Sequence, residues 1–146
     1  MSARRLNVSL PTEDAMHVTR LSLGKERLVY VIKANKKLKY GSERSKIAYI
    51  GTTKKGLSRI ASSVAYRANK ILNLHGVKSF TVAIVSCKGR KHVRTWFRLE
   101  RALLVKFCEM FGSVPVCNGK GHKMKHKGVW NLFRENRIKT IIEDLS

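Results

Sequence analysis

The sequence predicts an α/β protein of the α+β kind, in which a small three-stranded antiparallel sheet is flanked by helices. Two β-branched and aromatic runs, LVYVI from Leu28 and IAYIG from Ile47, flank a stretch rich in Lys, Gly and Ser, which is the pattern of a β-hairpin. A third run of this kind extends from Ser79 to Cys87. Between and after these runs, apolar residues recur at the spacing of amphipathic helices.

A single domain over residues 1–146 is the expected organisation, because 146 residues is the size of one ordinary domain. The sequence contains no internal repeat and no linker long enough to separate a second domain. The core is expected at about 27–120, after an N-terminal arm at 1–24 and before a C-terminal helix at about 129–145. Within the arm, TEDAMHVTRL is compatible with a short helix capped by Thr12.

The two strands of the hairpin are expected at about 27–34 and 46–52. This leaves NKKLKYGSER between them as a long and strongly basic loop. The third strand, Ser79 to Cys87, is nearly apolar throughout, so it is expected at the centre of the sheet.

One helix is expected after the second strand and another after the third. The first is expected from Gly56 to about Asn73, with its apolar residues on one side. Its other face is polar and carries Arg59, Ser63, Tyr66 and Lys70. The second helix, about 94–111, has an apolar stripe, and Glu100 lies at the edge of that stripe instead of on the solvent side. An acid in that place needs a salt-bridge partner or a metal ion.

The charge balance predicts a polyanionic partner. The chain has 31 Lys and Arg against 9 Asp and Glu, a formal net charge of +22. Nucleic acid is the leading candidate for such a partner. A membrane is not favoured, because there is no long basic amphipathic helix and no run of the ~18 apolar residues that a span needs.

The N-terminus and the cysteines indicate the compartment. The early arginines are not followed by an apolar segment of the kind that a secretory signal requires. The three cysteines, Cys87, Cys108 and Cys117, are an odd number and are read as reduced thiols. The protein is therefore expected to be soluble and intracellular, in the cytoplasm, nucleoid or nucleus, and not secreted.

Five sequence elements stand in a distinctive order: a tyrosine on each hairpin strand, a glycine closing the second strand, an arginine early in the next helix, a helical glutamate and an asparagine. They are LVY ending at Tyr30, YIG at Tyr49 to Gly51, Arg59, Glu100, and Asn118 in PVCNGKG. This order resembles the GIY-YIG nuclease family and spans residues 28 to 118. YIG alone is a weak match, but all five elements in this context are much more specific.

The resemblance implies a metal-dependent endonuclease that hydrolyses DNA phosphodiester bonds. By resemblance, Tyr49 is the general base, Tyr30 supports it, Arg59 binds the scissile phosphate, and Glu100 holds one divalent ion, Mg²⁺ or Mn²⁺. Asn118 helps to hold the site together. Phosphodiester hydrolysis requires a base, positive charge at the phosphate and usually a cation, and the sequence offers one group for each. The short chain favours a stand-alone enzyme, restriction-like or from a mobile or viral element, and cutting both strands would suggest a homodimer.

The sequence also departs from the family pattern. LVY lacks the leading glycine of GIY, and the hairpin loop is long. Ser63 stands where the family commonly has His or Tyr, and serine is a poor base. Tyr66, one turn further along the same helix face, could take that role or could be a partly buried surface tyrosine.

Each candidate residue also has a structural interpretation. Tyrosines in strands commonly pack in the core, Arg59 could be a solvated helix residue, and Glu100 could pair with an arginine. Asn118, which precedes Gly119, could simply form a turn. If all of these hold, the chain is a basic nucleic-acid-binding or architectural protein with the same fold and no catalysis.

Two further sets of residues could bind ligands. Lysines near the candidate site are expected to contact phosphates, with an affinity that falls steeply as salt rises. They are Lys36, Lys37, Lys39, Lys54, Lys55, Lys70, Lys120 and Lys123. Cys108, Cys117, His122 and His126 offer groups for zinc, but there is no CxxC, and the simpler interpretation is that the histidines belong to a basic phosphate-contacting loop.

Overall fold

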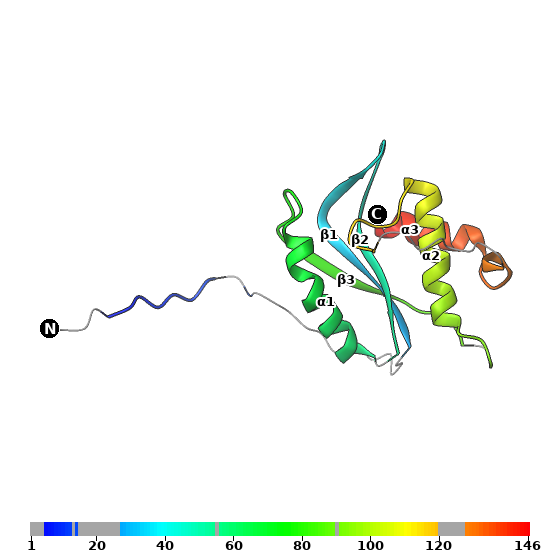
Figure 1. The fold of residues 1–146 in the computed structure, drawn as a ribbon, viewed down its shortest axis with the longest axis horizontal. Helices are drawn as coiled ribbons and strands as arrows, with labels where there is room; N and C mark the ends of the chain where they lie inside the picture. Colours follow the sequence, from blue (N-terminus) through cyan, green and yellow to red (C-terminus); the bar gives the residue numbers. More distant parts are fainter. Residues whose placement is uncertain (1–4, 13, 15–26, 55, 90, 120–127) are drawn as a thin grey trace.

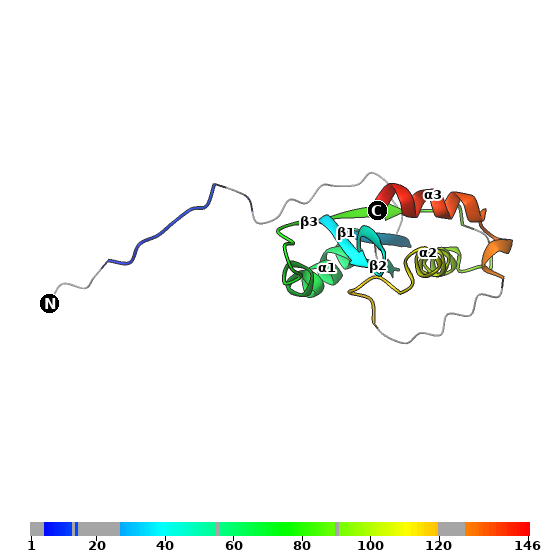
Figure 2. The same ribbon diagram turned by 90° about the horizontal axis from the view of Figure 1, so that it is seen from above.

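The computed structural model describes residues 5–12, 14, 27–54, 56–89, 91–119 and 128–146. Within these residues the elements are β1 (Leu28–Tyr40), β2 (Glu43–Thr53), α1 (Leu57–Leu72), β3 (Phe80–Val85), α2 (Thr95–Phe111), a short 3-10 helix (Val129–Asn131) and α3 (Glu135–Leu145). The strands form one antiparallel sheet. Helix α1 covers one face of the sheet, and α2 and α3 lie on the other (Figures 1 and 2). The predicted α+β architecture is confirmed.

The strand order is β2-β1-β3, so β1 is the central strand. The prediction that the strand near Ser79 to Cys87 is central is wrong, because β3 pairs with β1 alone. The side chains of residues 28–32 are all buried, since β1 has a neighbour on each side and helices on both faces. In β3, by contrast, Val82 is 37% exposed. An apolar run thus indicated a strand correctly but not its place in the sheet.

The predicted long hairpin loop is also wrong. Strands β1 and β2 continue through the basic stretch, and only Gly41 and Ser42 lie between them. Gly41 has a φ of +58° at the first turn position, where type II′ hairpin turns use glycine. Tyr40 is buried, with its ring centroid 5.0 Å from that of Phe107. The alternation of lysines with Leu38 and Tyr40 is therefore strand periodicity in a polar segment.

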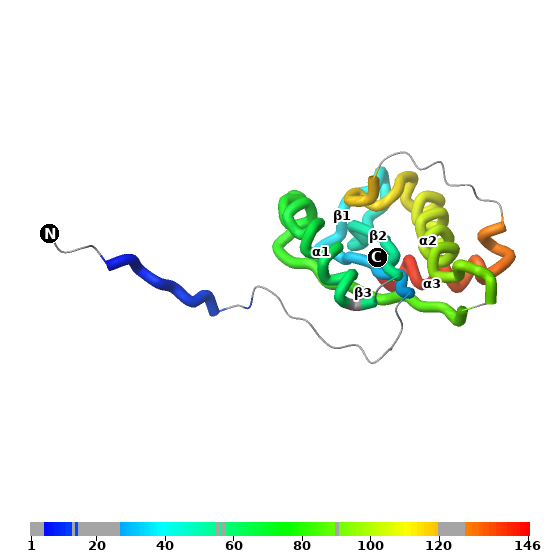
Figure 3. The backbone as a smooth tube through the Cα atoms, turned by 60° about the horizontal axis from the view of Figure 1, so that its bottom comes forward, coloured from blue at the N-terminus to red at the C-terminus, as the bar shows by residue number. Residues whose placement is uncertain are grey.

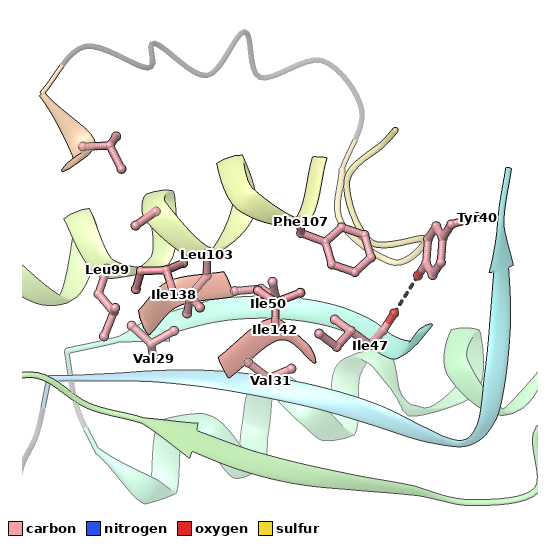
Figure 4. Close-up of a cluster of buried hydrophobic side chains, with 12 residues drawn as sticks. Val29, Val31, Tyr40, Ile47, Ile50, Leu99, Leu103, Phe107, Ile138 and Ile142 are labelled. Atoms are coloured by element: carbon pink, nitrogen blue, oxygen red, sulfur yellow. Dashed lines mark hydrogen bonds between the residues drawn. The ribbon is translucent and has the colours of Figure 1, made fainter. Parts of the chain in front are cut away.

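Alternate residues of β1 supply two hydrophobic clusters, one on each face of the sheet. Val29 and Val31 pack with residues of α2 and α3, including Leu103 and Ile142 (Figure 4). Tyr30 and Ile32, on the opposite face, pack with residues of α1. This alternation is what the two-residue repeat of a strand produces, and it places Tyr30 on the α1 side, where Tyr49 of β2 also packs.

The C-terminal helix begins later than predicted. The 129–145 segment contains a 3-10 turn, and α3 starts only at Glu135 because Arg134 is extended, with φ −69° and ψ 120°. Lys106 of α2 attaches α3, since its Nζ lies 2.7 Å from Glu109 and 2.5 Å from Glu135. The final residue, Ser146, accepts a hydrogen bond from Ser45, so the C-terminus lies beside β2 (Figure 3).

Helices α1 and α2 have the bounds that the sequence predicts to within a residue or two. Residues 5–12 have no regular structure, and most of the predicted helix in TEDAMHVTRL lies outside the described residues. None of the described helices is long and apolar enough to cross a bilayer.

Candidate active site

Tyr30 and Tyr49 lie together on the α1 side of the sheet. In the β1–β2 ladder Tyr30 pairs with Gly51 and Ile32 pairs with Tyr49, so the two tyrosines project from the same face. Their ring centroids are 5.8 Å apart. A Cβ placed on Gly51 would lie 2.6 Å from Cε1 of Tyr49 and 2.9 Å from the hydroxyl of Tyr30. The glycine of YIG therefore leaves the space into which both rings fit.

A β-bulge positions Tyr49. The register shifts next to it, because Ile32 pairs with Tyr49 while Lys33 pairs with Ile47, which leaves Ala48 as the extra residue of β2. As a result, the adjacent residues Ala48 and Tyr49 both contribute to the α1-side cluster. Bulges commonly redirect a side chain at a functional site in this way.

Helix α1 places Ser63 and Arg67 over the tyrosine pair. The hydroxyl oxygens of Tyr30 and Ser63 are 2.6 Å apart. A guanidinium N–H of Arg67 donates to the Ser63 hydroxyl oxygen at 2.6 Å and to its carbonyl at 3.1 Å. The same guanidinium lies 4.1 Å from the centroid of the Tyr49 ring. Ser63 thus links Tyr30 to Arg67, and Arg67 covers Tyr49.

Arg67 is a site residue that the sequence does not single out. It follows Ser63 by four positions and Arg59 by eight, a spacing that places all three on one helix face. That spacing is the available signal. The prediction favours the neighbouring Tyr66 instead, because its hydroxyl resembles the family pattern more closely.

The environment of Tyr49 disfavours its phenolate form. Burial, followed by the neighbouring Tyr30, raises the pKa of Tyr49 to about 12, and the positive charge of Arg67 acts in the opposite direction. The charge of Glu100 also contributes to raising this pKa, so Glu100 of α2 is electrostatically coupled to Tyr49. Glu100 is half-buried and has interactions with its surroundings. We call Tyr30, Tyr49, Ser63, Arg67 and Glu100 the tyrosine site.

Asn118 holds the outer edge of β2 beside the tyrosine site. Its side-chain oxygen accepts from the backbone N–H of Ile50 at 3.0 Å, and its amide nitrogen donates to the Ile50 carbonyl at 2.9 Å. The N–H of Cys117 donates to the carbonyl of Ala48. Because these bonds flank Tyr49 on both sides, they fix the bulged backbone. Asn118 is also in a turn, since its own N–H donates to the Pro115 carbonyl.

Two other predicted residues on α1 lie apart from this network. Arg59 is exposed in the first turn, and its side chain forms no hydrogen bond or ion pair with the residues that the structure describes. Tyr66 is 85% exposed, and its ring centroid is 5.8 Å from the Arg67 guanidinium. The structure therefore does not bring Tyr66 to the tyrosine pair, where Ser63 stands instead.

The predicted phosphate-binding lysines fall into three groups. Lys36, Lys37 and Lys39 are exposed on the outer part of β1. Lys54 and Lys70 are exposed near the two ends of α1. Lys55, Lys120 and Lys123 lie outside the described residues, as do His122 and His126 of the zinc hypothesis.

The described side chains near Tyr49 offer few ligands for a metal ion. Among the described residues, no group of three or more His, Cys, Asp and Glu could hold a metal ion. Glu100 supplies a single carboxylate, whose charge acts on the pKa of the Tyr49 phenol. Mg²⁺ usually keeps several waters and binds through one or two carboxylates together with substrate phosphates. Glu100 therefore fits Mg²⁺ held jointly with a phosphate, and it does not fit a closed structural site.

Comparisons of the chain with protein-family models, with curated proteins and with solved structures found no match.

Proposed function

We propose that this chain is a metal-dependent endonuclease of the GIY-YIG type, which hydrolyses phosphodiester bonds in DNA. The observation that carries the proposal is that Arg67 of α1 lies over the ring of Tyr49 of β2, while the charge of Glu100 of α2 also acts on the pKa of Tyr49. A phenol whose pKa is shifted by burial, by a guanidinium and by a carboxylate is typical of functional sites. The motif order in the sequence supports the same reaction.

Each residue of the site has a role in this reaction. Arg67 and the exposed Arg59 supply positive charge where negative charge develops on the phosphate. Glu100 is the residue that would hold Mg²⁺ or Mn²⁺, and such an ion polarises a phosphoryl oxygen when it is bound. Tyr49 is the base for the attacking water. Tyr30, Ser63 and Asn118 position these groups.

The raised pKa of Tyr49 restricts how it can act. At neutral pH the phenol is almost entirely protonated, and only the phenolate can remove a proton from water. Positive charge beside the ring is therefore essential to the proposal. Arg67 supplies part of that charge in the protein itself.

The substrate is DNA, bound mainly through phosphate contacts by a chain with a net charge of +22. One site per chain cuts one strand at a time, so cutting both strands together would suggest a homodimer. The enzyme acts inside the cell, as a restriction-like nuclease or as the nuclease of a mobile or viral element.

Plasmid cleavage tests this proposal. Supercoiled plasmid and linear DNA are incubated with the protein, with and without Mg²⁺ or Mn²⁺, beside Glu100→Gln and the control Glu143→Gln. Glu143 is an exposed glutamate of α3, 3.9 Å from Lys139. Metal-dependent nicking that is lost in Glu100→Gln and kept in Glu143→Gln is the expected result. Equal cleavage by both variants would contradict the role of Glu100.

A non-catalytic nucleic-acid-binding protein is the second candidate. Two observations favour it: Ser63 occupies the position where the family commonly has His or Tyr, and burial keeps Tyr49 protonated. This candidate predicts tight, salt-sensitive binding to DNA without cleavage of any substrate in either metal.

A further inference from the structure

The outer half of the β1–β2 hairpin projects from the body of the protein. Its tip extends past the ends of α1 and α2 (Figure 1), and β1 bends sharply between Val31 and Tyr40 (Figure 4). The register shift between Lys33 and Leu38 accounts for this bend, because bulges bend and twist a strand. Beyond the shift, Leu38 pairs with Ser45 and Lys39 pairs with Arg44.

The register divides this ribbon into two different faces. Cross-strand partners project to the same side, and so do alternate residues of one strand. One face therefore carries Leu38, Tyr40, Ser45 and Ile47. This face is covered, since Tyr40 packs on Phe107 and Ser45 bonds to Ser146.

The other face is basic. By the same register it carries four exposed cations: Lys37, Lys39, Arg44 and Lys46. The single acidic residue of the hairpin, Glu43, pairs with Tyr40 and so projects from the opposite face. We call Lys37, Lys39, Arg44 and Lys46 the basic ribbon face. None of the four forms an ion pair or a hydrogen bond through its side chain with any described residue.

The basic ribbon face lies on the same side of the sheet as Tyr30 and Tyr49 of the tyrosine site. Ala48 follows Lys46 by two positions and belongs to the cluster that packs against α1, beside Tyr49. A single DNA molecule that touches the ribbon can therefore also pass the tyrosine site.

We propose that the basic ribbon face enters the major groove of B-form duplex DNA, which makes duplex DNA the substrate of the tyrosine site. The inference rests on the proposed function for the reaction but concerns binding alone. Two strands lie ~4.8 Å apart, and the major groove of B-DNA, ~12 Å wide, admits a two-stranded ribbon. The major groove of A-form RNA is too deep and narrow for side chains to read. Four cations on one face match the phosphates that border the groove.

The test measures binding without divalent metal, so that cleavage plays no part in it. The full chain is titrated with a fluorescent DNA duplex, with double-stranded RNA and with single-stranded DNA, over a series of salt concentrations. The variant Lys39→Gln/Arg44→Gln removes the cross-strand cation pair. Its control, Arg134→Gln/Arg137→Gln, removes two exposed arginines at the start of α3. Methylation by dimethyl sulfate reports the groove, because guanine N7 lies in the major groove and adenine N3 in the minor groove.

The proposal predicts that the ribbon variant binds duplex DNA about tenfold more weakly and that its salt slope becomes shallower by ~0.9 for each phosphate that it no longer binds. The control keeps its affinity, and saturating wild-type protein protects guanine N7. Equal decreases in affinity in both variants, equal affinity for RNA duplex, or protection of adenine N3 alone would overturn the proposal. Groove binding without cleavage would instead contradict the nuclease, and cleavage without groove binding would contradict only this inference.

Discussion

The guanidinium of Arg67 lies 4.1 Å from the centroid of the Tyr49 ring, and Ser63 holds it there through two hydrogen bonds. A cation on the face of a phenol ring is attracted to that ring, and it also favours the ionised form of the hydroxyl. The pKa of Tyr49 in β2 therefore depends on where α1 places Arg67.

Replacement of Arg67 by alanine should slow DNA cleavage by roughly 10²-fold, the usual effect of removing one charge-stabilising group. DNA affinity should hardly change, because 31 basic residues contribute to it. Single-turnover cleavage and equilibrium binding, measured in parallel, separate the two effects. Arg137→Ala is the control, and a similar loss of cleavage in that variant would refute a specific role for Arg67.

Replacement of Gly51 by alanine should destabilise the protein by about 1–3 kcal/mol through overpacking. The new methyl group would approach both tyrosine rings to less than 3.0 Å, so one ring has to move. Urea unfolding measures the change. Gly89→Ala is the matched control, since a Cβ there meets no atom within 4 Å. Equal stability of the two variants would show that the rings yield without strain.

Tyr40 and Tyr49 should ionise late in a pH titration. Burial raises the pKa of Tyr40 and of Tyr49 to about 12, whereas unfolded tyrosines ionise near ~10. Between these values the folded state binds more protons, so the free energy of unfolding falls as pH rises from ~10 to about 12. Tyrosinate absorbance should show a late phase that shrinks in Tyr49→Phe and in Tyr40→Phe. Complete ionisation near pH 10 with circular dichroism unchanged would contradict these shifts.

Replacement of Asn118 by alanine should cost about 1–3 kcal/mol, because the backbone N–H and carbonyl of Ile50 lose their partner at the edge of β2. Cleavage should fall as well, since the bulge beside Tyr49 loses its support. Unfolding and cleavage are measured on the same preparations. Asn136→Ala, at an exposed site on α3, is the control. Unchanged stability in Asn118→Ala would mean that water replaces the side chain.

Periodicity in the sequence predicted the strands, α1 and α2, but not how the strands pair. An apolar run looks the same at the centre and at the edge of a sheet, so β3 was misplaced. The hairpin was predicted too short because lysines alternate with Leu38 and Tyr40, and a polar strand face resembles a loop. The strand continues as far as Tyr40, which is buried against Phe107. These two residues are far apart in the sequence, so local periodicity does not reveal their contact.

The candidate site could be predicted in part. The motif order predicts Tyr30, Tyr49 and Glu100 as site residues, and in the structure Tyr30 and Glu100 both act on the pKa of Tyr49. It did not identify Arg67, whose role follows from the direction of its side chain over β2. The resemblance predicts that Asn118 helps to hold the site together, but its two hydrogen bonds to Ile50 could not be read from the sequence, because they are made to the backbone.

The proposed role of Tyr49 as general base is tested most directly by single-turnover DNA cleavage with Tyr49→Phe and Tyr66→Phe. DNA affinity is measured alongside. Tyr49 lies beneath Arg67 in the tyrosine site, whereas Tyr66 is 85% exposed on the same helix as Arg67. Tyr49→Phe should lose metal-dependent cleavage and retain binding, while Tyr66→Phe should cut at the wild-type rate. Wild-type cleavage by Tyr49→Phe would show that the tyrosine site is not the catalytic centre.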